Sequence, residues 1–406
     1  MRRVIAAYRL SFSGLPRPVW LLAGAVLVNR AGTMVLPFLS LYLTRELGFT
    51  AVRAGQILSL YGVGSMVGST LGGWLSDRIG AVRVQGLSLA ATGLGFLVLT
   101  RITDFSALAA SVFVVSVVSE SFRPAVMTSV AEHSRPPIRA RCFALVRLSV
   151  NTGMAVGPAV GGFLAAQHYT LLFVVDAATC WAAAAVLWAT LGFSRPPPSM
   201  VSGTEHQSRT SPWRDVPFLA FLGLIVLLGV IFLQIWVTLP LELRDSFGFS
   251  ERGIGLLIAL NPAMIVAFEM VLMRAVERLG SMRVAAVGAG LVGCGLAILT
   301  FGHSLLVAVC STLVWTLGEM LSLPMTNAVA AERAGSGAAG RYMGAYTLAF
   351  STAFVLAPVL GGWTYQRHGG DALWSAAGVA GVLLFISFWA LGRHLSADPE
   401  ASKKHR

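Results

Sequence analysis

Residues 77–84 read DRIGAVRV, and residues 277–284, 200 positions further along the chain, read ERLGSMRV. Each octet ends one hydrophobic segment and opens the next. The same offset pairs further glycines and prolines, among them Gly55 with Gly255 and Pro158 with Pro358. Residues of these types fix backbone geometry or stand at helix ends. We therefore interpret the chain as two copies of one structural unit.

The composition excludes a soluble protein. Hydrophobic residues make up 56% of the 406, and only 12% are charged, whereas soluble domains carry about 25% charge. A helix that crosses a bilayer needs about 20 apolar residues, and the sequence holds twelve such runs, six in each half. Backbone polar groups in hydrocarbon must be satisfied within their own helix. The prediction is an all-α integral membrane protein, with twelve transmembrane helices in two pseudo-symmetric six-helix bundles.

The distribution of charge explains the net charge of +12. When the N-terminus is placed in the cytoplasm and the sides alternate, the inside segments carry most of the arginines and lysines. This positive-inside bias predicts that both termini are cytoplasmic. It also argues against nucleic acid as a partner. The four cysteines show no paired spacing, so no disulfide, metal site or cofactor is expected.

Polar stretches divide the chain into five predicted parts. Residues 1–18 form a cytoplasmic segment, 19–192 the first bundle, 193–216 a linker rich in Pro, Ser and charge, 217–394 the second bundle and 395–406 a cytoplasmic tail.

The loop at the first octet carries a specific motif. Gly73, Asp77, Arg78, Gly80 and Arg83 form the pattern G-x3-D-R-x-G-x2-R. This pattern resembles the loop signature of the major facilitator superfamily, in the place where that family has it, although Ala81 departs from the basic residue usual there. The resemblance extends over the whole chain and implies the major facilitator fold.

The resemblance also implies a conformational latch at the cytoplasmic face. Asp77 is expected to pair with the start of helix eleven near Arg341. Its counterpart in the second octet, Glu277 followed by Arg278, is expected to pair near Arg141.

Helix five carries a stripe of small residues. Gly153, Gly157 and Gly161 are four apart and share one helix face, which lets another backbone approach closely. Pro158 bends the helix. Together with Gly162 these residues resemble the G-x3-G-P-x2-GG signature of the drug:proton antiporter branches. Helix eleven lacks the first two glycines, so the full signature is confined to the first half.

Several ionisable residues interrupt apolar runs, where a charge costs roughly 2.5–3.5 kcal/mol on insertion scales. Glu120 is the preferred proton carrier, because Arg123 and also Arg30 or Arg147 are expected within reach of its carboxylate. A permanent structural ion pair is the alternative. Glu319, near the position that mirrors Glu120, is a second candidate. Glu269 and Asp176 are interpreted as structural.

Substrate contacts are predicted from polar and aromatic residues of the lining helices, which would suit an amphiphilic ligand. They are Asn29, Arg30, Asn151, Gln234, Trp236, Asn261, Trp315 and Glu319.

These features favour a monomeric secondary transporter in the inner (plasma) membrane of a bacterium. It would export small amphiphilic compounds in exchange for protons. Proton-coupled uptake of a small solute such as a peptide, and lysophospholipid flipping, remain alternatives on the same fold. An enzyme is not expected, because the sequence contains no HExxH, no GxSxG and no phosphate-binding loop.

Overall fold

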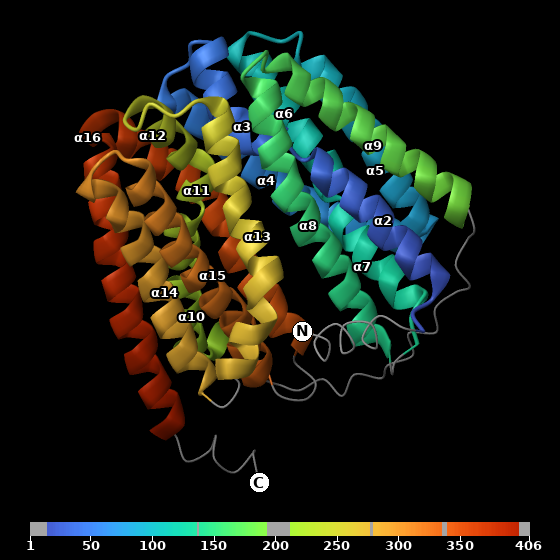
Figure 1. The fold of residues 1–406 in the computed structure, drawn as a ribbon. Coiled ribbons are helices and arrows are strands. Elements are labelled where there is room, and N and C mark those ends of the chain that lie inside the picture. The colour runs from blue at the N-terminus through green and yellow to red at the C-terminus, as the bar shows by residue number, and fades with distance from the viewer. Residues whose placement is uncertain (1–13, 136–137, 193–211, 277–278, 335–338, 398–406) are drawn as a thin grey trace, which may run out of the picture. The chain divides into compact units, whose positions relative to one another are not determined.

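The computed structural model describes residues 14–135, 138–192, 212–276, 279–334 and 339–397 (Figure 1). All regular structure in these ranges is helical. The first half of the chain contains α2 (Arg17–Gly32), α3 (Val35–Leu41), η1 (Tyr42–Glu46), α4 (Ala51–Ile79), α5 (Ala81–Leu99), α6 (Phe105–Glu120), α7 (Phe122–Glu132), α8 (Arg139–Ala165) and α9 (Thr170–Leu191). The second half contains η3 (Pro212–Arg214), α10 (Val216–Phe232), α11 (Gln234–Val237), α12 (Leu239–Asp245), α13 (Glu251–Val276), α14 (Ser281–Ala297), η4 (Ile298–Phe301), α15 (Leu305–Ala334) and α16 (Ala339–Ala397).

The predicted all-α membrane class is confirmed. Ten helical segments of the described residues are long and apolar enough to cross a membrane. Two features explain the difference from the expected twelve. Gly369 has φ 82° inside α16 and divides it into two helices. The 29-residue helix α4 is not among the ten, because many glycines and hydroxyl residues lower its hydropathy.

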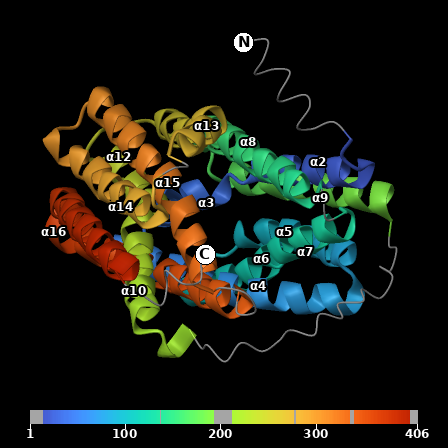
Figure 2. The same ribbon diagram turned by 90° about the horizontal axis from the view of Figure 1, so that it is seen from below.

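The helices form two compact units. Unit 1 consists of Met1–Tyr42, Leu60–Met200 and Ser250–Val266, and unit 2 of Leu43–Ser59, Val201–Phe249 and Ala267–Arg406. In unit 1, α2 packs against α8 and α9, and α5 packs against α9 and α6, as Figure 2 also shows. In unit 2, α14 packs against α15 and α16, and α10 against α16.

Both units have an apolar core. The core of unit 1 is built from small and aliphatic side chains of α2, α7, α8 and α9, such as Leu22, Val146 and Ala183. In unit 2, aromatic rings stack between α10 and α16. Phe221 packs on Tyr346 and Phe388 with centroid distances of 6.3 and 6.0 Å.

The 200-residue offset pairs Gly55 with Gly255 and Pro158 with Pro358, and two contacts each join one of these glycines to one of these prolines. In unit 2, a Cβ on Gly55 of α4 would collide with the carbonyl oxygen of Pro358 in α16. In unit 1, a Cβ on Gly255 of α13 would collide with the carbonyl oxygen of Pro158 in α8. Each repeated glycine thus meets the repeated proline of the other half. These contacts explain why each unit includes a short segment from the other half of the sequence.

Candidate functional site

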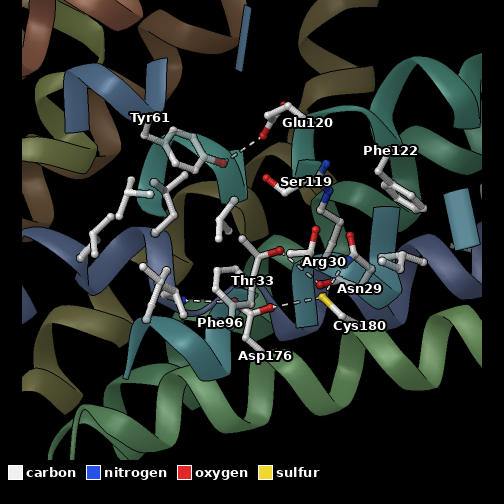
Figure 3. A pocket seen from close by; sticks show the side chains of 18 residues that line it. Asn29, Arg30, Thr33, Tyr61, Phe96, Ser119, Glu120, Phe122, Asp176 and Cys180 are labelled. Atoms are coloured by element: carbon white, nitrogen blue, oxygen red, sulfur yellow. Dashed lines mark hydrogen bonds between the residues drawn. The ribbon is translucent and has the colours of Figure 1, made fainter. Parts of the chain in front are cut away.

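A cavity of about 70 Å³ lies within unit 1, between α2, α3, α4, α5, α6, α7 and α9 (Figure 3). A water molecule needs about 10–15 Å³ of such volume, so the cavity has room for several waters. Pockets for drug-sized ligands measure about 300–1,000 Å³. The cavity therefore suits water and protons better than an organic substrate.

Glu120, at the C-terminal end of α6, faces this cavity. The Tyr61 hydroxyl from α4 donates a hydrogen bond of 3.0 Å to its Oε1 (Figure 3). Sequence reasoning missed Tyr61, because it stands 59 residues before its partner on a different helix.

Arg30 enters the same cavity from the last turn of α2, with its side chain extending toward Ser119 and Glu120 (Figure 3). Its Nε is buried and makes no hydrogen bond within the described residues. In that part of the chain, no carboxylate oxygen lies within the 4.0 Å of an ion pair with Arg30. The structure thus brings Arg30 and Glu120 into one cavity without a closed salt bridge between them.

The other two predicted partners of Glu120 lie elsewhere. Arg123 on α7 and Arg147 on α8 are both exposed, and neither lines the cavity. Of the three arginines predicted near Glu120, Arg30 alone lines its cavity.

The first predicted transmembrane helix, here called helix one, is broken at the cavity into α2 and α3, and Asp176 of α9 lies at the break. Thr33 leaves the helical conformation with φ −67° and ψ 80°, and α3 begins at Val35. The Asp176 Oδ2 accepts hydrogen bonds from the backbone N–H of Met34 at 3.3 Å and of Val35 at 3.4 Å. The side chain is only 3% exposed. Asp176 thus receives two N–H groups that the helix break leaves without intrahelical partners.

A sequence signal for this arrangement exists. Pro37 lies four residues after Thr33, and a proline at that position removes the hydrogen bond to the Thr33 carbonyl and its ring clashes with that carbonyl. The break at Thr33 leaves the N–H groups of Met34 and Val35 in need of an acceptor, and Asp176 is the carboxylate on the helix beside them.

The glycine stripe of α8 packs against the other side of this break. A Cβ on Gly153 would lie 2.5 Å from the Cβ of Arg30, and one on Gly157 would lie 2.9 Å from the Thr33 carbonyl oxygen. A Cβ on Gly161 would lie 3.1 Å from the Cβ of Met34. The stripe therefore allows α8 to approach the backbone of helix one where that helix breaks.

The predicted substrate contacts lie apart from this cavity, except for Asn29 and Arg30. The Asn29 side-chain amide points to the Cys180 sulfur at 3.5 Å. In unit 2, Gln234 is fully engaged, because its Nε2 donates to the carbonyl of Ala357 at 2.9 Å and its Oε1 accepts from Thr238 at 3.0 Å. Gln234 thereby connects α11 to α16.

The remaining predicted contacts have different surroundings. Trp315 is 2% exposed and packs against Gly295 of α14, so it belongs to the core of unit 2. Asn261 is buried on α13, and partly exposed positions are held by Asn151 on α8, Trp236 on α11 and Glu319 on α15. Their role as substrate contacts stays a prediction.

The chain turns at Gly80 in the first octet. Gly80 has φ 93° between α4 and α5, in a region that favours glycine. Asp77 is exposed, and the Arg78 guanidinium lies 4.0 Å from the ring centroid of Trp74. Glu277 and Arg278 lie outside the described residues. The latch stays a prediction.

An ion pair that the sequence did not reveal joins three helix ends of unit 2. Arg333, at the end of α15, donates from Nε to the Asp215 Oδ2 at 2.8 Å and from its terminal nitrogen to Oδ1 at 2.9 Å. The hydroxyl of Tyr342, near the start of α16, donates to the same carboxylate at 3.1 Å. Asp215 also caps α10 by accepting from the Phe218 N–H at 3.2 Å.

Comparisons with known proteins agree with this fold. The family model described as Major Facilitator Superfamily matches residues 21–353 and, separately, residues 219–406. The chain is 25% identical over 360 residues to the uncharacterized MFS-type transporter YqjV of Bacillus subtilis (strain 168), covering 84% of each chain. It is 24% identical over 387 residues to the multidrug resistance protein MdtH of Edwardsiella ictaluri (strain 93-146), covering 91% of this chain and 93% of that protein.

Solved structures show the same fold. A POT family transporter in complex with 5-aminolevulinic acid has a TM-score of 0.80 at 17% identity, covering 95% of this chain and 98% of that chain. The nucleoside transporter NupG has a TM-score of 0.78 at 13% identity, covering 92% of this chain and 100% of that chain. Identities this low show a shared fold alone.

Proposed function

Because the chain belongs to the major facilitator superfamily and is thus a multi-pass membrane transporter rather than an enzyme, we propose that it exports small amphiphilic compounds in exchange for protons. The two halves would expose a binding site to each side of the membrane in turn. We place it in the inner membrane of a bacterium with both termini in the cytoplasm, as the positive-inside bias predicts.

The observation that carries the proton coupling is the position of Glu120. A carboxylate inside a membrane helix is costly unless it has a partner or a function. Glu120 faces a cavity with room for several waters, is hydrogen-bonded to Tyr61 and forms no ion pair with Arg30. Such a group can exchange a proton with water as access alternates. A permanent structural ion pair, the alternative from the sequence, would require a closed contact with Arg30.

The size of the cavity supports separate binding sites for the proton and the substrate. A volume of about 70 Å³ accommodates water but no amphiphilic organic molecule. Proton binding would take place here, within unit 1, and the substrate would bind elsewhere. The direction of transport rests on the glycine signature of α8 and on the multidrug transporter among the relatives.

Accumulation of a fluorescent dye in efflux-deficient cells tests the proposal. Cells with the wild-type chain should accumulate less dye than empty cells, and an uncoupler should abolish the difference. Glu120→Gln should behave like empty cells. Asp104→Asn, at the other end of α6, is the matched control and should export like the wild type.

Two outcomes would contradict the proposal. Export that persists in Glu120→Gln under a pH gradient would remove Glu120 from the coupling. Higher dye accumulation with the wild type than in empty cells would indicate uptake.

A further inference from the structure

The charges around the cavity do not balance. Three charged side chains line it: Arg30, Glu120 and Asp176. With both acids ionised, the cavity carries one negative charge in excess. Such an excess charge is unfavourable inside a membrane-spanning segment unless it is compensated. Binding of one proton would remove it.

Arg30 forms an ion pair with neither acid within the described residues. Its buried Nε has no hydrogen-bond partner within the described residues, and both carboxylates lie beyond ion-pair distance. The hydroxyl of Thr92, a residue that is 4% exposed on the cavity wall, is also unpartnered in that part of the chain. The cavity has room for several waters, which can supply hydrogen-bond partners for these groups.

We propose that Asp176 is the second acid of the proton site, sharing one proton with Glu120 across Arg30. This inference deepens the proposed function, because it adds a residue to the same proton site. The proton comes from water and binds to one carboxylate, and Arg30 then compensates the charge of the other. On release the proton returns to water, and Arg30 faces both acids again.

Sharing through Asp176 links proton binding to the shape of helix one. The ionised carboxylate accepts the N–H groups of Met34 and Val35 at the break. A carboxylate accepts such bonds about twice as strongly as a neutral group. Protonation of Asp176 thus weakens the hold on the start of α3. The Cys180 sulfur from the same helix lies 4.0 Å from the Asp176 Oδ1, and Arg30 of α2 supplies the positive charge.

Proton binding by the purified full-length protein in detergent tests the inference without a substrate. Difference titrations between about pH 5 and about pH 9 would compare each variant with Glu120→Gln/Asp176→Asn. The wild type should bind about one proton more than this double variant. Asp176→Asn and Glu120→Gln should each bind about none, because each leaves one acid opposite Arg30. Arg30→Gln should bind about two, because two acids then face no cation.

The asparagine keeps an acceptor for the Met34 N–H, which favours folding, and a monodisperse gel-filtration peak confirms it. Asp176→Ser is the second variant if the first aggregates. Asp104→Asn, an exposed acid outside the cavity, should titrate like the wild type.

The results separate this inference from the proposed function. If Asp176→Asn binds a proton as the wild type does while Glu120→Gln does not, Asp176 is only a helix clamp and the inference is overturned. If both variants bind the proton, the inference is overturned as well. In either case, dye transport by Glu120→Gln judges the proposed function independently.

Discussion

The Asp215–Arg333 pair gives a stability prediction that the structure makes quantitative. Asp215→Ala removes two hydrogen bonds to the Arg333 guanidinium at 2.8 and 2.9 Å, one from Tyr342, and the cap of α10. Loss of a cap costs about 1 kcal/mol. Removing one partner of a fully buried ion pair costs 3–5 kcal/mol.

Exposure reduces the second figure. The side chain of Arg333 is 28% exposed and that of Asp215 is 12% exposed, so the pair lies between a buried and a surface ion pair. We assign about 2 kcal/mol to it. Together with the cap, Asp215→Ala should lower the free energy of unfolding by about 3 kcal/mol.

A double-mutant cycle with Arg333→Ala isolates the pair. The two single substitutions should not be additive, and the coupling should be about 2 kcal/mol in denaturant titrations of the purified protein. Asp104→Ala is the matched control, because Asp104 caps α6 through the Ala107 N–H at 2.9 Å without an ion pair among the described residues. It should cost about 1 kcal/mol. Equal costs for Asp215→Ala and Asp104→Ala, or full additivity in the cycle, would refute this reasoning.

Three further predictions follow from single contacts. Burial alone would raise the pKa of Asp215, but the hydrogen bonds and charge of Arg333 and the other donors lower it. The ionised carboxylate therefore stabilises the fold above the unfolded pKa of about 3.9, and this stabilisation is lost as the pH falls through the lower folded pKa. Asp215→Asn should thus be less stable than the wild type near neutral pH and equally stable only below about pH 4, as measured in unfolding titrations. Gly153→Ala should destabilise the protein, because the added Cβ would lie 2.5 Å from the Cβ of Arg30. Gly344→Ala is the control: no atom lies within 4 Å of its Cβ, so it should stabilise the protein by roughly 0.5–1 kcal/mol in thermal unfolding. Destabilisation by both substitutions would contradict the packing argument. Gln234→Leu leaves buried carbonyl groups unpaired and should lower the free energy of unfolding by about 1–3 kcal/mol. An unchanged midpoint of thermal unfolding would show that the hydrogen bond to α16 is dispensable.

Much of the fold could be predicted because the repeat and the apolar runs carry it directly. The glycine stripe of α8 was predictable as a packing surface, since a spacing of four places Gly153 and Gly157 on one face. Its partner was not predictable. Many helices could use a smooth face, and only the structure shows that helix one does so at its break.

The candidate site was predictable in its charges but not in its geometry. A buried acid such as Glu120 stands out in an apolar run, but its neighbours depend on how four helices rotate about their axes. Tyr61 resembles any interfacial tyrosine in the sequence. Asp176 was taken as structural, although Pro37 signals the helix break that needs its oxygen. Likewise, Asp215 and Arg333 are 118 residues apart, and nothing local pairs them.

The crossed glycine–proline contacts have an evolutionary consequence. Gly55 meets Pro358 and Gly255 meets Pro158, so one kind of contact occurs twice with the two copies exchanged. In a single-copy ancestor, residues equivalent to Gly55 and Pro158 would have met between two subunits, in the reciprocal pattern of a two-fold symmetric dimer. Fusion of two such copies would turn an intermolecular contact into an intramolecular one. A mutation at one of these four positions affects one contact in this chain, whereas in a dimer of identical copies it would alter both at once.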